Sequence, residues 1–83
     1  MVEALRDPRL RVVGLKQTLR NLQQDRVAVV YLANDIDDHI RRKVGTACAE
    51  RDVEMRPAKL NQAEMGALCG IEVGTAVVAV LKP

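Results

Sequence analysis

VAVVYLA, residues Val27 to Ala33, is an uninterrupted apolar run in which three of the seven positions hold valine. No polar residue recurs in it at helical spacing, and β-branched residues favour extended backbone. The run therefore predicts a strand that is buried on both faces and lies in the centre of a sheet.

A helix is predicted before this strand. Leu15, Leu19 and Leu22 recur at i, i+4 and i+7, which places them in one apolar stripe on a helix that follows Gly14 and ends at about Gln24. The opposite face of this helix is polar and holds Lys16, Gln17, Arg20 and Gln24.

A second helix is predicted after the strand. Asn34 and Asp35 offer a cap for it, and Asp37 and Asp38 suit the positive end of its dipole. Its apolar stripe consists of Ile36, Ile40, Val44, Ala47 and Cys48.

The rest of the chain continues the alternation. Val53 to Ala58 predicts a short strand in which Pro57 marks the end or an edge position, and Asn61 to Glu64 has the form of a capping box. Gly70 is placed to end that helix in the left-handed conformation, and Thr75 to Leu81 predicts the last strand. The amino-terminal segment predicts a helical turn over Val2 to Arg6 and an extended stretch from Leu10 to Val13.

Strands that alternate with helices predict an α/β fold, here a three-layer α/β/α sandwich with a small four-stranded mixed sheet. We expect one domain over residues 1–83, because a chain of this length supports a single core.

Composition excludes several classes of function. One Tyr and no Phe or Trp leave almost no aromatic platform on which successive bases could stack. Cys48 and Cys69 stand 21 positions apart without a CxxC motif, which indicates small buried thiols and no zinc site. No leader and no membrane-spanning run is found, so we expect a cytoplasmic protein without membrane contact.

The net charge of +2 is mild, but its distribution is uneven. The basic residues of the first 24 positions are Arg6, Arg9, Arg11, Lys16 and Arg20. Only Glu3 and Asp7 oppose them, so the amino-terminal segment is the basic end of the chain.

The segment GLKQTLR places a cluster of donors at a helix start. The first amide groups of a helix lack partners within it, and Lys16, Gln17 and Arg20 stand beside them within about one turn. Such a cluster fits phosphates or base edges. The alternative is a solvated helix face that follows a turn at Gly14.

The loop GIEVG, from Gly70 to Gly74, holds Ile71 and Val73 between glycines. These side chains would pack on an extruded base or ribose while Glu72 and loop amides supply hydrogen bonds. The alternative is that Ile71 makes the apolar contact that accompanies a glycine at a helix end.

The remaining polar clusters favour structural roles. The run DIDD, Asp35 to Asp38, is more typical of helix capping than of a metal site or an acid–base pair. His39 has no second ligand at metal-binding spacing, and no nucleophile–base pair or phosphate loop is found. We therefore expect no catalytic residue, no metal ligand, no cofactor and no small-molecule substrate.

Three segments together resemble one family: Gly14 to Arg20, Leu32 to Asp37, and Met65 to Val73. They resemble the kink-turn RNA-binding ribosomal proteins of the L7Ae and L30e superfamily, and the GLKQT and GIEVG stretches are most similar to its small bacterial branch, the YbxF type. The resemblance runs from about Leu10 to Leu81, with the segments in the family's order.

The resemblance implies the L30e-like sandwich and binding to a kink-turn, a sharply bent RNA duplex with tandem sheared G·A pairs beside a three-nucleotide bulge. By this resemblance Gly14 lets the helix start approach the RNA. Lys16, Gln17 and Arg20 stand where archaeal members have the Asn, Glu and Lys of the pattern G-x-N-E-x-x-K. Asp37 matches an acidic position that accepts from a guanine or orients the basic cluster.

The resemblance also assigns the loop after the last helix to the bulge. Ile71, Glu72 and Val73 match the residues that cradle the extruded nucleotide, and Val73 stands where archaeal and eukaryotic members commonly have Arg. The RNA-binding residues expected on this basis are Gly14, Leu15, Lys16, Gln17, Arg20, Asp37, Ile71, Glu72, Val73 and Gly74.

We therefore expect a non-catalytic, monomeric RNA-binding protein that recognises and stabilises kink-turns in ribosomal or riboswitch-type RNA. The first alternative is a protein interaction module of the same fold with weak or no RNA binding. The second is a substrate-recognition domain of the kind that precedes the catalytic domain in some RNA methyltransferases.

Overall fold

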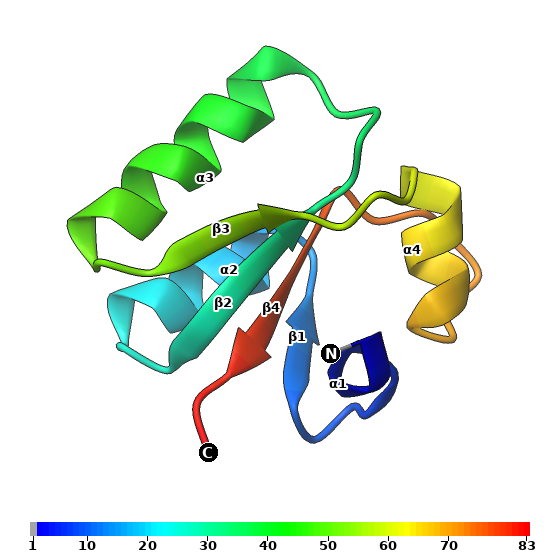
Figure 1. The fold of residues 1–83 in the computed structure, drawn as a ribbon, viewed down its shortest axis with the longest axis horizontal. Coiled ribbons are helices and arrows are strands. Elements are labelled where there is room, and N and C mark those ends of the chain that lie inside the picture. The colour runs from blue at the N-terminus through cyan, green and yellow to red at the C-terminus, as the bar shows by residue number, and fades with distance from the viewer. Residues whose placement is uncertain (1) are drawn as a thin grey trace.

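The computed structural model describes residues 2–83, with side chains from residue 4 onward. Figure 1 shows helices and strands alternating along this range. In chain order they are α1 (Val2–Arg6), β1 (Arg11–Val13), α2 (Leu15–Gln23), β2 (Val27–Leu32), α3 (Asp38–Glu50), β3 (Glu54–Pro57), α4 (Gln62–Leu68) and β4 (Val77–Leu81).

The strands form one mixed sheet in the order β1-β4-β2-β3. β4 pairs antiparallel with both β1 and β2, and β2 pairs parallel with β3. The last strand of the chain therefore separates the first two. The four-stranded mixed sheet predicted from the sequence is confirmed, and Pro57 ends an edge strand as expected.

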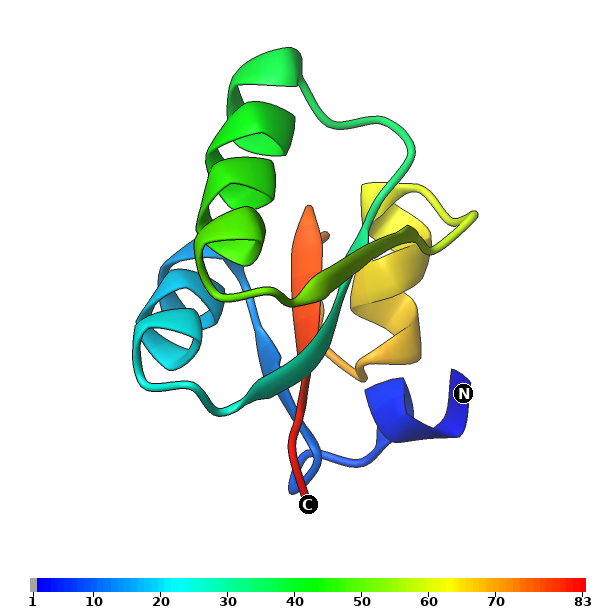
Figure 2. The same ribbon diagram turned by 60° about the vertical axis from the view of Figure 1, so that its left-hand side comes forward.

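Helices cover both faces of this sheet, as Figure 2 shows, with α2 and α3 on one side and α1 and α4 on the other. Each side has its own core. The core beneath α2 and α3 consists of Leu22, Val27, Val30, Leu32, Val44, Cys48, Val77 and Ala79. The core beneath α1 and α4 consists of Leu5, Tyr31, Ala33, Met65, Cys69 and Val78. This is the predicted α/β/α sandwich.

The run Val27 to Ala33 forms β2 and contributes side chains to both cores, which confirms a central strand buried on both faces. Ala28 is the exception, because it is exposed. It lies where the pairing of β2 with β4 shifts register between Val27 and Val29. An extra residue at such a bulge leaves the regular ladder.

The predictions for α2 and α4 are confirmed. Leu22 is buried and Leu15 and Leu19 pack against the same core, so the leucine stripe faces the sheet. In the capping box of α4, the Asn61 side chain accepts a hydrogen bond from the Glu64 amide at 2.8 Å. The Glu64 side chain accepts one from the Asn61 amide at 2.9 Å.

The predicted start of α3 is wrong. Asp37, and not Asn34 or Asp35, is the N-cap, and its carboxylate accepts from the Ile40 amide at 2.9 Å. The Asp35 carboxylate instead accepts from the Gln62 amide at 2.8 Å, which ties the loop after β2 to the start of α4. Asp35 therefore links two segments that are distant in the sequence, and α3 begins at Asp38.

Candidate nucleic-acid interface

The start of α2, the loop after β2 and the loop that enters β4 meet at one end of the sheet. β4 runs antiparallel to β1 and β2, so its beginning lies beside their ends. The Gly14 amide donates to the Val77 carbonyl at 2.9 Å, and the Ala33 amide donates to the Ala76 carbonyl at 2.9 Å. The start of α2, the loop of residues 33–37 and the loop of residues 70–76 therefore converge (Figure 1).

Gly14 sets the direction in which α2 begins. Its φ of 97° and ψ of 160° are values that side-chain-bearing residues rarely adopt. As N-cap it offers no side chain to bond the first amide groups of α2, and an added Cβ would meet no protein atom within 4 Å. The helix start is thus uncapped by a side chain and sterically open, which are the properties of a site for an acceptor group.

The buried face of α2 fixes which side chains point outward. Thr18, Asn21 and Leu22 are buried, and the Asn21 side chain donates to the Gln17 carbonyl at 2.8 Å. The exposed residues of the candidate site on this helix are Lys16, Gln17 and Arg20. Leu15, in contrast, is half-buried and packs against the core, so it anchors the helix start and offers little surface.

The second part of the candidate site is the end of α4 and the loop that follows it. Gly70 has a φ of 74°, the Ile71 amide donates to the Gly66 carbonyl at 3.0 Å, and the Gly70 amide donates to the Ala67 carbonyl at 3.0 Å. These bonds form a Schellman motif, which confirms the predicted glycine ending.

Within that loop the side chains divide into two groups. Ile71 is half-buried against the core beneath α1 and α4, so the alternative reading of an apolar contact at the helix end holds for this residue. Glu72, Val73 and Gly74 are exposed, and Val73 is 70% accessible. Val73 is thus a large apolar side chain presented to solvent from the loop that leads into β4.

Asp37 lies in the third loop at the same end of the sheet. Its carboxylate is exposed and its Oδ1 caps α3, so the structure gives it a structural role.

Arg11 is a residue that the sequence reasoning counted only as part of a basic segment. Its guanidinium is partly buried and donates to two backbone carbonyls, that of Leu5 in α1 and that of Cys69 at 2.7 Å. Cys69 immediately precedes the loop of residues 70–76, so Arg11 fixes the position from which this loop leaves α4. The other basic residue near it, Arg9, pairs with Asp7 at 3.0 Å. No local pattern distinguishes Arg11, because its partners are backbone carbonyl groups, one of them 58 positions away.

Among the described residues no group of three or more His, Cys, Asp or Glu side chains is arranged to hold a metal ion. No helix within residues 2–83 has the length and apolar character needed to span a bilayer.

Comparisons with known proteins give a consistent picture. Residues 2–83 match the profile of the ribosomal protein L7Ae/L30e/S12e/Gadd45 family. An RNA-binding protein of Caldanaerobacter subterraneus subsp. tengcongensis is 40% identical over 72 residues, which cover 87% of this chain and 87% of that protein. The RNA-binding protein YbxF of Geobacillus stearothermophilus is 37% identical over 71 residues, which cover 86% of this chain and 85% of that protein.

Solved structures share the fold. The chain is similar to a Giardia lamblia 15.5kD RNA binding protein with a TM-score of 0.83 at 20% identity, over 99% of this chain and 68% of the other. The two bacterial relatives are named as RNA-binding proteins, in agreement with the expectation of a non-catalytic protein. The chain therefore belongs to the ribosomal protein L7Ae/L30e/S12e/Gadd45 family.

Proposed function

We propose that this chain is an RNA-binding protein that recognises kink-turns and stabilises their bent form. The observation that carries the proposal is the open start of α2, with its exposed Lys16, Gln17 and Arg20. The Gly14 amide at this start bonds the Val77 carbonyl, just after the loop that exposes Val73. The naming of its relatives as RNA-binding proteins supports the same conclusion.

The two parts of this surface suit different parts of a kink-turn. Gln17 offers a donor and an acceptor that can read a base edge, whereas Lys16 and Arg20 can bind phosphates or the acceptor edge of guanine. On this proposal the α2 start lies against the sheared G·A pairs. Because the protein binds only the bent RNA tightly, binding shifts the RNA toward the bent conformation.

The loop after α4 suits the bulge. Val73 is apolar and exposed, so it can pack on a base or ribose that has left the stack, and Glu72 and the loop amides can accept from or donate to its edge. A chain with a single aromatic residue cannot use ring stacking here, which makes aliphatic packing the available contact.

Alanine substitutions on α2 test this proposal. Lys16→Ala and Arg20→Ala should each weaken kink-turn binding by about 1–3 kcal/mol. Where the lost contact is to a phosphate, the slope of log K against log salt concentration should also become shallower by about one. Lys82→Ala is the matched control, because Lys82 is exposed just beyond β4, at the opposite end of the sheet. Equal effects of all three substitutions would show a diffuse charge effect and no site on α2.

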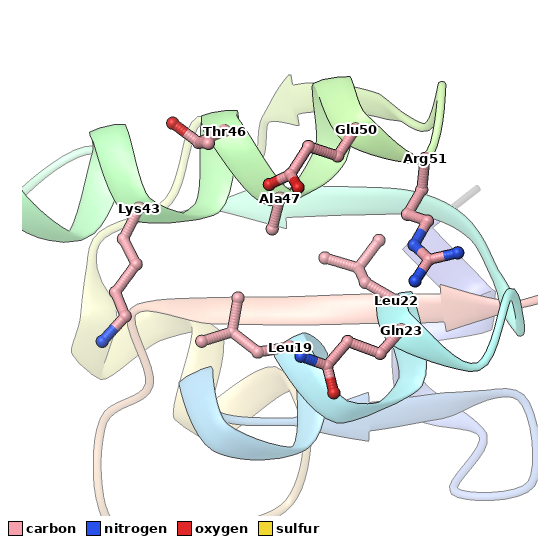
Figure 3. A pocket seen from close by; sticks show the side chains of 8 residues that line it. All are labelled: Leu19, Leu22, Gln23, Lys43, Thr46, Ala47, Glu50 and Arg51. Atoms are coloured by element: carbon pink, nitrogen blue, oxygen red, sulfur yellow. The ribbon is translucent and has the colours of Figure 1, made fainter.

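The alternative function is a protein interaction module of the same fold. The observation in its favour is a groove of about 440 Å³ between α2 and α3, shown in Figure 3. Leu19 and Leu22 of α2 point toward Ala47 of α3 in this groove, while Lys43 and Glu50 stand on its α3 side. Under this alternative the chain binds RNA weakly or not at all, so Lys16→Ala and Arg20→Ala should cause no appreciable loss of kink-turn affinity.

We propose that residues 1–83 act as one RNA-binding domain and as a monomer in the cytoplasm, on kink-turns of ribosomal or riboswitch-type RNA. Sedimentation of the free protein and of its RNA complex tests the oligomeric state. We expect the mass of one chain for the free protein and one protein per kink-turn in the complex.

A further inference from the structure

The loop of residues 70–75 folds back along α4 and is held there by backbone contacts. The Ile71 amide donates to the Gly66 carbonyl at 3.0 Å, and the Thr75 amide donates to the Gln62 carbonyl at 3.1 Å. Residues 72–74 lie between these two bonds. The loop thus runs antiparallel to the helix from which it leaves, as Figure 1 also shows.

Two glycines allow this close approach. Gly66 is buried, and a Cβ there would overlap the carbonyl oxygen of Val73 and come within 3.0 Å of the Cα of Gly74. A Cβ on Gly74 would lie 3.1 Å from the carbonyl carbon and oxygen of Gln62. The contact is backbone against backbone, so a methyl group at Gly66 cannot be accommodated by a side-chain rotation.

This packing determines how the exposed part of the loop is presented. The Val73 carbonyl faces Gly66, while the Val73 side chain is 70% accessible. At the other side of the loop Thr75 is buried, and its hydroxyl donates to the Val77 carbonyl at 2.9 Å. The backbone on either side of Val73 is therefore fixed before any ligand binds.

We propose that Gly66 is a positioning residue for the recognition of the extruded bulge nucleotide. It holds the loop of residues 70–75 against α4, so that Val73 is presented in a preformed geometry. The proposal rests on the function proposed above. It adds that a buried glycine inside α4 sets how the loop presents Val73 to the nucleotide.

Two glycine-to-alanine variants test it. Gly66→Ala should displace the loop, whereas Gly45→Ala in α3 is the matched control, because a Cβ at Gly45 meets only the Met55 methyl group at an ordinary 3.6 Å. Both changes improve helix propensity, so a difference between them reports the loop contact and not the helix. Hydrogen exchange should be faster at the Thr75 amide in Gly66→Ala and unchanged in Gly45→Ala.

The RNA readout uses two ligands, a kink-turn and the same kink-turn with an abasic extruded nucleotide. For the wild-type protein and Gly45→Ala, removal of the base should weaken binding by about tenfold or more. For Gly66→Ala the kink-turn should bind more weakly and removal of the base should have little further effect. A merely structural role would lower the melting temperature and leave the dependence on the base intact.

The outcomes separate the two proposals. If the wild-type protein does not bind the kink-turn, the proposed function fails. If Gly66→Ala folds and retains the full dependence on the base, the role of Gly66 is overturned while the function stands. If Gly66→Ala does not fold, Gly74→Ala decides, because its milder contact should give a folded protein with reduced dependence on the base, and full dependence would overturn the proposal.

Discussion

At the scale of the residue, Thr18 has an unusual environment for a polar side chain. It is 0% accessible on the buried face of α2, and its Oγ1 has no hydrogen-bond partner among the described residues. A buried hydroxyl without a partner has lost its hydrogen bonds to water and forms none within the protein, which costs free energy on folding. The hydroxyl of Thr18 is therefore expected to oppose folding.

Thr18→Val should consequently leave the free energy of unfolding unchanged or raise it by up to about 1 kcal/mol, since valine keeps the shape and removes the hydroxyl. Urea denaturation measures this change. The control is Thr46→Val on the exposed face of α3, where a change within about 0.5 kcal/mol is expected. A loss of more than about 1 kcal/mol in Thr18→Val would mean that the hydroxyl has a stabilising partner.

At the scale of the element, Arg11 links two helices on the same face of the sheet. Its guanidinium donates to the Leu5 carbonyl of α1 and to the Cys69 carbonyl at the end of α4. Carbonyl groups at helix ends lack partners within the helix, so a cation that bonds them stabilises both ends at once. β1 contributes this side chain from the edge of the sheet.

Arg11→Met keeps most of the apolar stem and removes the donors. We expect the free energy of unfolding to fall by about 1–3 kcal/mol, because two hydrogen bonds from a charged group are lost in a partly buried setting. Arg42→Met, in an exposed position of α3, should change it by no more than about 0.5 kcal/mol. Equal stability of the two variants would show that the Arg11 bonds contribute nothing.

The elements also show which structural features a sequence can reveal. The capping box of α4 and the glycine ending at Gly70 were predictable because both depend on residues within one turn. The start of α3 was not, since Asp35 and Asp37 are equally good caps locally. The contact of Asp35 with the Gln62 amide, 27 positions away, decided between them.

At the scale of the whole molecule, each of the two cores contains one buried thiol, Cys48 beneath α2 and α3 and Cys69 beneath α1 and α4. Burial raises the pKa of both thiols above their ordinary value of 9.0. A raised pKa in the folded state means that the unfolded chain loses these protons first as the pH rises. The associated stability is fully present below the unfolded pKa and is lost as the pH rises through the folded pKa.

We therefore expect the free energy of unfolding to fall as the pH rises above 9.0, the ordinary thiol pKa, and to fall less steeply in Cys48→Ala. Urea denaturation across this range measures the slope. Val44→Ala is the control, because it opens a cavity beside the same core without removing a titratable group, so it should lower the stability and keep the wild-type slope. A slope that is unchanged in Cys48→Ala would contradict the assignment.

The whole candidate site was predictable only in part. Exposure of Lys16, Gln17 and Arg20 followed from helical periodicity, because the leucine stripe fixes the opposite face. Gly66 was missed, although a glycine inside a short helix is itself a signal of close packing. Its partner, the Val73 carbonyl, becomes apparent only when the loop is seen folded along α4. The order of the strands, which brings the loops together, likewise depends on pairing between distant segments.

The most direct test of the proposed function is a titration of the protein into an end-labelled kink-turn RNA at fixed moderate salt. The control RNA has Watson–Crick pairs in place of the sheared G·A pairs, and energy transfer between the two arms reports bending. We predict tight binding with folding of the kink-turn, and binding of the control that is weaker by about tenfold or more. Equal binding of both RNAs, or binding of neither, would contradict the account and favour the protein interaction module.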